Sequence, residues 1–91
     1  MISVKFYNYS DSEQYIENLK VDIQDSFQMY YPNSEINFNK VDDEFQFIFN
    51  DNWSDVEEID LDVINDICSS NEVYCSILVN DEINENFYYD E

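Results

Sequence analysis

Hydrophobic and polar residues alternate along four stretches of the chain, as they do in strands that bury one face. In the first stretch Val4 and Phe6 point to one side while Lys5 and Tyr7 point to the other, because successive side chains of a strand leave opposite faces. The same alternation predicts strands over 2–9, 34–41, 44–49 and 73–79. The strand over 44–49 also has an apolar residue on its reverse face, so we expect it in the interior of the sheet.

A longer period, typical of an amphipathic helix, follows the first strand. The apolar stripe of this helix consists of Ile16, Leu19, Ile23, Phe27 and Tyr30. Ser10 and Glu13 are spaced as in a capping box, in which each side chain accepts a hydrogen bond from the other residue's backbone. Pro32 ends the pattern, since proline cannot continue a helix.

A second helical period covers residues 54–68. Here the apolar stripe consists of Val56, Ile59, Val63, Ile64 and Ile67. Ser54 and Glu57 form a second capping box. We expect the helix to end near Asn71, because asparagine tolerates the left-handed conformation that often closes a helix.

The order of these elements, βαββαβ, predicts one domain over residues 1–91 with an α+β fold. We expect a four-stranded antiparallel sheet with two helices on one face, the ferredoxin-like arrangement. The last twelve residues leave two alternatives open. They form a fifth strand after a turn at Asn80 and Asp81, or a short helix that begins at Asp81.

Charge changes the picture from an ordinary small domain to an unusual one. The 91 residues carry a net charge of −19, with 22 acidic residues and three lysines. Lys40 is the last of these lysines, so the chain beyond it contains carboxylates and no cation. On the predicted second helix, the acidic residues Asp55, Glu58, Asp62 and Asp66 form a ladder. Like charges at this spacing destabilise a helix, which indicates that the ladder serves binding rather than stability.

Several classes of function are excluded or disfavoured by composition. The chain has no histidine, arginine or glycine, so general acid–base catalysis and a glycine-rich phosphate loop lack their usual residues, and we expect no enzyme. The segment from Asp51 to Glu57 lacks the glycine of a calcium loop, so we expect neither a metal nor another cofactor. The negative field repels nucleic acid and anionic lipid, and the chain has no long apolar run.

Two further features of the sequence are interpreted independently of its charge: the aromatic residues of one sheet face and the two cysteines. The exposed face of the predicted sheet carries Tyr7, Tyr9, Tyr74 and Leu78, which indicates a homodimer contact or a surface that the C-terminal tail covers. Cys68 and Cys75 lie outside any metal-binding motif, and we interpret them as buried thiols, with a disulfide as the alternative. A cytoplasmic protein fits the thiol interpretation.

We therefore expect a basic partner protein to be recognised by the acidic residues and nearby aromatic side chains. The candidate partner-binding residues are Asp42, Asp43, Glu44, Asp51, Trp53, Asp55, Glu58, Asp62, Asp66, Asp81, Glu82, Glu85, Tyr88 and Tyr89.

In size, near-absence of cations and the Asp55/Glu58/Asp62/Asp66 type of array, the whole chain resembles the DNA-mimic inhibitors of phages and mobile elements. These include anti-CRISPR proteins, antirestriction proteins and uracil-DNA glycosylase inhibitors. The resemblance implies no catalytic residues and a target whose basic cleft normally holds nucleic acid. Within the group we favour an anti-CRISPR protein that blocks a Cas effector in the host cytoplasm.

Two alternatives stay open at the level of sequence. An immunity protein or antitoxin that neutralises a basic nuclease toxin would use the same electrostatics. A subunit that assembles through its apolar sheet face, with acidic residues that only confer solubility, belongs to a different class.

Overall fold

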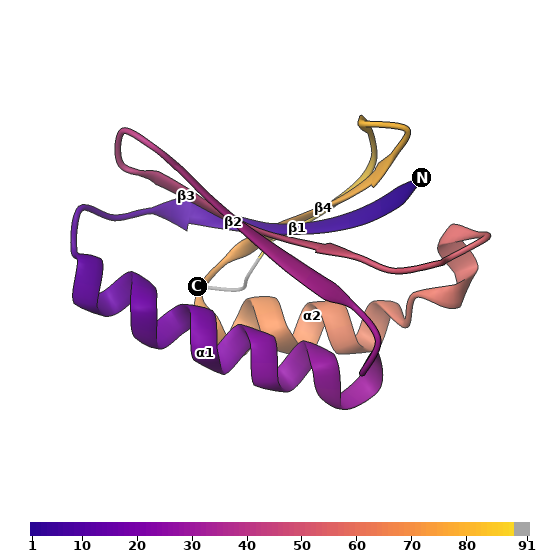
Figure 1. The fold of residues 1–91 in the computed structure, drawn as a ribbon, viewed down its shortest axis with the longest axis horizontal. Coiled ribbons are helices and arrows are strands. Elements are labelled where there is room, and N and C mark those ends of the chain that lie inside the picture. The colour runs from indigo at the N-terminus through magenta and orange to yellow at the C-terminus, as the bar shows by residue number, and fades with distance from the viewer. Residues whose placement is uncertain (89–91) are drawn as a thin grey trace.

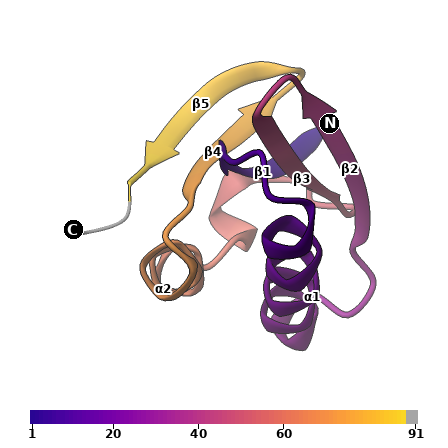
Figure 2. The same cartoon turned by 90° about the vertical axis from the view of Figure 1, so that its left-hand side faces the viewer.

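The computed structural model describes residues 1–88, which form two helices on one face of a five-stranded antiparallel sheet (Figures 1 and 2). In chain order the elements are β1 (Ile2–Tyr9), α1 (Glu13–Tyr30), β2 (Glu35–Val41), β3 (Glu44–Asn50), the short 3-10 helix η1 (Val56–Glu58), α2 (Leu61–Asn71), β4 (Tyr74–Val79) and β5 (Glu82–Phe87). The predicted α+β class is confirmed.

The strands are ordered β2-β3-β1-β4-β5, and every neighbouring pair is antiparallel. The first four strands therefore have the order that a βαββαβ chain of ferredoxin-like type adopts, with α1 and α2 packed beneath them (Figure 2). β3 lies inside the sheet, as its apolar reverse face predicted. The sheet has the four expected strands and a fifth, β5, at its edge.

The core lies between the sheet and the two helices. Val4 and Phe6 of β1 are fully buried, and in register Phe6 stands between Phe47 of β3 and Cys75 of β4. From below, Phe27 of α1 packs against this layer, with ring centroids 5.8 Å from Phe6. A single core therefore links both helices to the three central strands.

The first helix begins with a different cap from the one predicted. Its N-cap is Ser12, whose Oγ accepts a hydrogen bond from the backbone N–H of Tyr15, while Ser10 lies two residues before it. The helix ends at Tyr30, before Pro32 as predicted, but Tyr30 is 59% exposed and Tyr31 contacts the core instead. Tyr31 is already outside the helix, so the helical period no longer decides which way its side chain points.

The predicted helix over 54–68 is wrong at its beginning. Residues 56–58 form the separate turn η1, and α2 begins only at Leu61, with Asp60 as its N-cap. The proposed capping box of Ser54 and Glu57 is absent, since the Ser54 N–H donates to Oε2 of Glu58 instead.

The end of α2 also differs from the expectation. Glu72, rather than Asn71, takes the left-handed conformation, with φ 54° and ψ 49°. Asn71 remains helical, and its Nδ2 donates to the carbonyl oxygen of Ile67.

The open question about the tail is answered in favour of a fifth strand. Asn80 and Asp81 both have positive φ, 53° and 66°, which is the signature of a tight two-residue hairpin turn. β5 then pairs with β4, with an irregularity in register between Ile77 and Leu78. Neither helix of residues 1–88 has the length and apolar character that crossing a bilayer requires.

Candidate partner-binding surface

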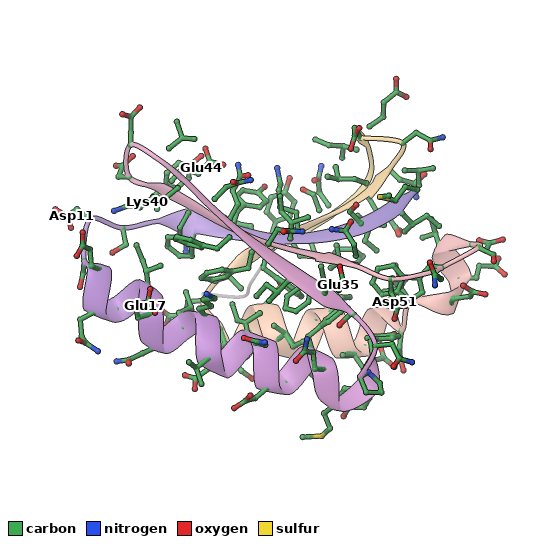
Figure 3. All side chains as sticks on the ribbon, viewed as in Figure 1. Asp11, Glu17, Glu35, Lys40, Glu44 and Asp51 are labelled. Atoms are coloured by element: carbon green, nitrogen blue, oxygen red, sulfur yellow. The ribbon has the colours of Figure 1, made fainter. Side chains whose placement is uncertain are left out.

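The acidic side chains are almost all at the surface. Within residues 1–88 every Asp and Glu is exposed except Glu44 and Asp51, which are half-buried. Their positions span much of the molecule: Asp11 lies at one end of the long axis, which measures 36 Å, and Asp51 lies toward the other (Figure 3). The acidic residues therefore form a wide surface and not a single row.

The open face of the sheet, which points away from the helices, is the exception to this distribution. On the three central strands its side chains are Ser3, Lys5, Tyr7, Tyr9, Glu44, Gln46, Ile48, Asn50, Tyr74, Ser76 and Leu78. Glu44 is the one carboxylate among them, and it lies at the end of β3. Lys5 lies near the middle, in register between Ile48 and Ser76.

Aromatic side chains give this open face its character. The rings of Tyr7 and Tyr74 are 5.6 Å apart, and Tyr88 packs edge-on against Tyr74 at 5.9 Å. Burial raises the pKa of Tyr7, while a hydrogen bond with Ser76 acts in the opposite direction. Tyr88, the residue after β5, thus contacts one tyrosine of this face. The two expectations for the face, a homodimer contact or a covering tail, both stay predictions.

The predicted ladder of four carboxylates is broken by the late start of α2. Asp62 and Asp66 lie on that helix, one turn apart and exposed. Asp55 and Glu58 belong to the preceding loop and η1. The physical reason is competition from capping: carboxylates in this segment accept backbone N–H groups that a continuous helix would have used.

Each carboxylate that holds this loop has an identified backbone partner. Asp55 Oδ1 accepts the N–H of Glu57 at 3.1 Å, and Asp60 Oδ1 accepts that of Asp62 at 3.0 Å. Asp51 Oδ1 accepts the N–H of Asn52 at 2.7 Å. Two candidate residues, Asp51 and Asp55, and the N-cap Asp60 therefore stabilise the connection from β3 to α2.

The remaining acidic candidates lie in the two hairpin turns and along β5. Asp42 and Asp43 form the turn between β2 and β3, which Figure 1 places at the opposite end of the long axis from η1. Asp81 lies in the turn between β4 and β5. Glu82 and Glu85 are opposite Val79 and Ile77 in register, so they lie on the helix-bearing side of the sheet.

The three aromatic candidates have different positions. Trp53 is half-buried and packs edge-on against Phe27 and Tyr31, with centroids 6.1 and 5.6 Å apart, so it belongs to the margin of the core. Tyr88 is 67% exposed. Tyr89 lies outside the described residues.

The sequence interpretation missed the acidic residues of α1. Glu13, Glu17, Asp22 and Asp25 are all exposed on this helix, next to α2 in the same layer. The signal was present in the helical period, which put them opposite the apolar stripe. It was overlooked because Lys20 lies among them.

The lysines do not neutralise this surface. Among the described residues no lysine forms an ion pair with a carboxylate. Instead the ammonium group of Lys5 lies 4.9 Å from the ring centroid of Tyr7, and that of Lys20 lies 5.8 Å from that of Phe38. The described carboxylates therefore have no direct lysine partner.

The two cysteines are free, buried thiols at the contact of α2 with β4. Burial raises the pKa of the Cys75 thiol well above its usual range, and a hydrogen bond with Cys68 acts in the same direction. No group of three or more Cys, Asp or Glu side chains within residues 1–88 is arranged to hold a metal ion.

The chain matches no protein-family model and no curated protein at a significant level. A proposal about function therefore depends on the physical character of the surfaces described above.

Proposed function

We propose that the protein binds a strongly basic, nucleic-acid-binding protein through the acidic surface of its helix layer and adjoining turns. In this proposal it occupies the cleft that normally holds nucleic acid and so acts as a DNA-mimic inhibitor. The observation that carries the proposal concerns residues 1–88: nearly all their carboxylates are exposed, and no lysine forms an ion pair with them.

This arrangement has an energetic cost that a merely soluble domain would avoid. Mutual repulsion of charges destabilises a compact state, and interspersed cations are the usual remedy. A basic groove would supply the missing cations when it binds. Opposite charge also accelerates encounter, and this acceleration falls as salt screens the field.

The broken ladder changes how such mimicry would work. Asp62 and Asp66 are the only two of the four that share a helix, so they cannot alone follow a phosphate backbone. The proposal instead uses the breadth of the helix layer, to which α1 contributes Glu17, Asp22 and Asp25. Its partner would be a wide basic cleft rather than a narrow slot.

Among such inhibitors we favour an anti-CRISPR protein that acts on a Cas effector, on the basis of the resemblance in size and charge. The alternative is an immunity protein or antitoxin directed at a basic nuclease toxin. Since both use the same electrostatics, the neighbouring genes distinguish them: a toxin gene alongside favours immunity, and a prophage or plasmid setting favours counter-defence.

The test is capture of host proteins on the immobilised protein at low and at high salt, followed by identification of what elutes. We expect a basic nuclease or Cas effector that is released by salt. The double reversal Asp62→Lys and Asp66→Lys should abolish capture, because it changes the helix layer.

A matched control is the single reversal Glu35→Lys, at an open-face position of β2, beside the single reversal Asp66→Lys, which changes net charge equally. Glu35→Lys should retain most of the capture, and Asp66→Lys should weaken it. Equal loss with both single reversals would mean that net charge alone governs binding, and capture of no basic protein would refute the proposed function.

A further inference from the structure

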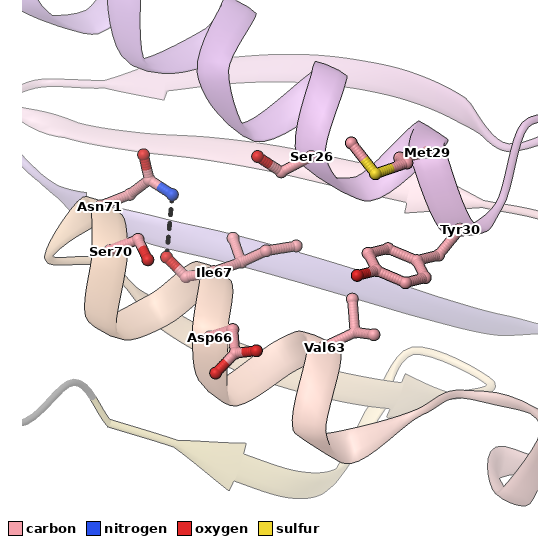
Figure 4. Close-up of a pocket in the computed structure, with 8 residues that line it drawn as sticks. All are labelled: Ser26, Met29, Tyr30, Val63, Asp66, Ile67, Ser70 and Asn71. Atoms are coloured by element: carbon pink, nitrogen blue, oxygen red, sulfur yellow. Dashed lines mark hydrogen bonds between the residues drawn. The ribbon is translucent and has the colours of Figure 1, made fainter.

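The groove between α1 and α2 has the size and lining of a site for one side chain. Its volume is about 190 Å³, and its residues come from the C-terminal part of α1 and the length of α2 (Figure 4). An apolar cavity of about 150 Å³ accommodates benzene, whereas sites for drug-sized ligands run from about 300 Å³. This groove is therefore too small for a cofactor.

The floor and one wall of the groove are apolar. Val63 and Ile67 of α2 are nearly buried, while Met29 and Tyr30 of α1 are 75% and 59% exposed. The ring of Tyr30 extends from α1 toward α2 (Figure 4). Large exposed apolar side chains beside a cavity are typical of a binding site.

The groove has a single charged group, the exposed carboxylate of Asp66, which only accepts hydrogen bonds. The hydroxyls of Ser26, Tyr30 and Ser70 can donate or accept, and Asn71 uses its Nδ2 to donate to the Ile67 carbonyl oxygen at 2.9 Å. None of the eight lining residues is basic, so no lining side chain pairs with Asp66.

We propose that this groove receives an arginine side chain of the basic partner, with its aliphatic part against Val63 and Ile67 and its guanidinium against Asp66 and Tyr30. Arginine carries only donors, bonds a carboxylate through two parallel N–H groups and stacks on aromatic rings, so it matches this lining better than the compact lysine ammonium. The inference rests on the proposed function and specifies the groove between α1 and α2 as the place where an arginine of the partner binds.

The test uses short neutral-ended peptides and the whole ¹⁵N-labelled protein. Acetyl-Gly-Arg-Gly-amide is titrated at low salt, beside peptides that carry lysine or the uncharged isostere citrulline in place of arginine. We expect saturable amide shifts confined to residues 26–30 and 63–71 with the arginine peptide, weaker binding of lysine, and none of citrulline.

Variants locate the contact. Asp66→Asn should weaken the arginine peptide about three- to tenfold, the range for a partly exposed charge-assisted hydrogen bond. Asp62→Asn removes the same charge from the same helix outside the groove, so it should weaken binding clearly less than Asp66→Asn does, through the long-range field alone. Ser26→Phe should fill the groove and abolish the localised shifts while leaving both carboxylates in place.

Three results would overturn the inference: equal effects of the two asparagine variants, shifts spread over all acidic segments without saturation, or equal binding of the lysine or citrulline peptide. Such failure with continued salt-sensitive capture of a basic protein would leave the proposed function standing. Peptide binding in the groove without capture of any basic protein would instead refute the proposed function alone.

Discussion

Individual residues in this glycine-free chain adopt backbone conformations that glycine usually supplies. Asp42, Glu72, Asn80 and Asp81 all have φ between 53° and 66°. For residues with a side chain the left-handed conformation costs roughly 1 kcal/mol or more, and least for Asn and Asp. Glu72 is therefore the most strained of the four by residue type. It also places a negative charge at the negative end of α2.

Replacement Glu72→Gly is expected to stabilise the protein by about 1 kcal/mol, because it relieves the left-handed strain and removes an unfavourable charge. Urea denaturation at pH 7 measures this change. Asn71→Gly, one position earlier and still helical, should destabilise by about as much. Destabilisation by both variants would contradict the left-handed assignment of residue 72.

The Cys75 thiol is expected to make the free energy of unfolding fall at alkaline pH. Its folded-state pKa is raised by burial, so between its unfolded value, about 8.5, and the higher folded value the unfolded chain loses a proton that the folded chain keeps. Stability is thus complete below about pH 8.5 and falls as pH rises. We expect the loss from this group to approach about 1 kcal/mol per pH unit above its unfolded pKa, for as long as the folded thiol keeps its proton.

Urea denaturation in the presence of a reductant measures this slope. The variant Cys75→Ala should be less stable at pH 7 because it leaves a cavity, yet its stability should decline less steeply above pH 8.5. Parallel curves for the two proteins would show that Cys75 does not titrate as described.

At the scale of elements, the hydrophobic period of the sequence predicted the type of each helix and strand well, but it predicted the first residue of the helices poorly. Alternation predicted the four strands and the buried stripe of α1, because burial of one face selects that pattern directly. The segment 54–60 shares the helical period of α2 but contains Asp55 and Asp60. Their carboxylates bond nearby backbone N–H groups, and this local competition is not visible in the period.

The same limit applied to the candidate surface. The sequence identified the acidic residues, whereas their arrangement depended on where α2 begins and which side of each turn faces outward. The groove at Tyr30 was missed because the helical period assigned that residue to the core. Tyr31, just beyond the helix, takes the core position instead.

The start of α2 can be tested by removing alternative caps. Asp60→Ala should destabilise the protein by about 1 kcal/mol, since Asp60 accepts the N–H of Asp62 at the helix N-terminus. Ser54→Ala should change the free energy of unfolding by less than about 0.5 kcal/mol, because that hydroxyl caps no helix. A larger loss of stability from Ser54→Ala than from Asp60→Ala would instead support the continuous helix from residue 54 that the sequence predicted.

At the scale of the whole molecule, repulsion among the carboxylates acts over its full size in dilute buffer. The Debye length is about 30 Å at 0.01 M salt, close to the 36 Å long axis, and about 8 Å at 0.15 M. Added salt therefore screens the repulsion between charges on distant parts of the molecule.

We expect the melting temperature to rise by about 5 °C or more between 0.01 and 0.5 M NaCl, which corresponds to about 1 kcal/mol for a domain of this size. Differential scanning calorimetry measures the change. The double reversal Asp62→Lys and Asp66→Lys should respond less, since its net charge is smaller. A melting temperature that is independent of salt would contradict strong repulsion across the surface.

The tyrosine-bearing open face has a consequence for stoichiometry. A partner docked on the helices, as proposed, would leave that side turned outward, so the assembly would present the face of the molecule with the fewest charges. Two such assemblies could approach back to back through this face with little electrostatic penalty. Under the proposal, the number of copies in a complex would then depend on the side of the molecule opposite the partner contact.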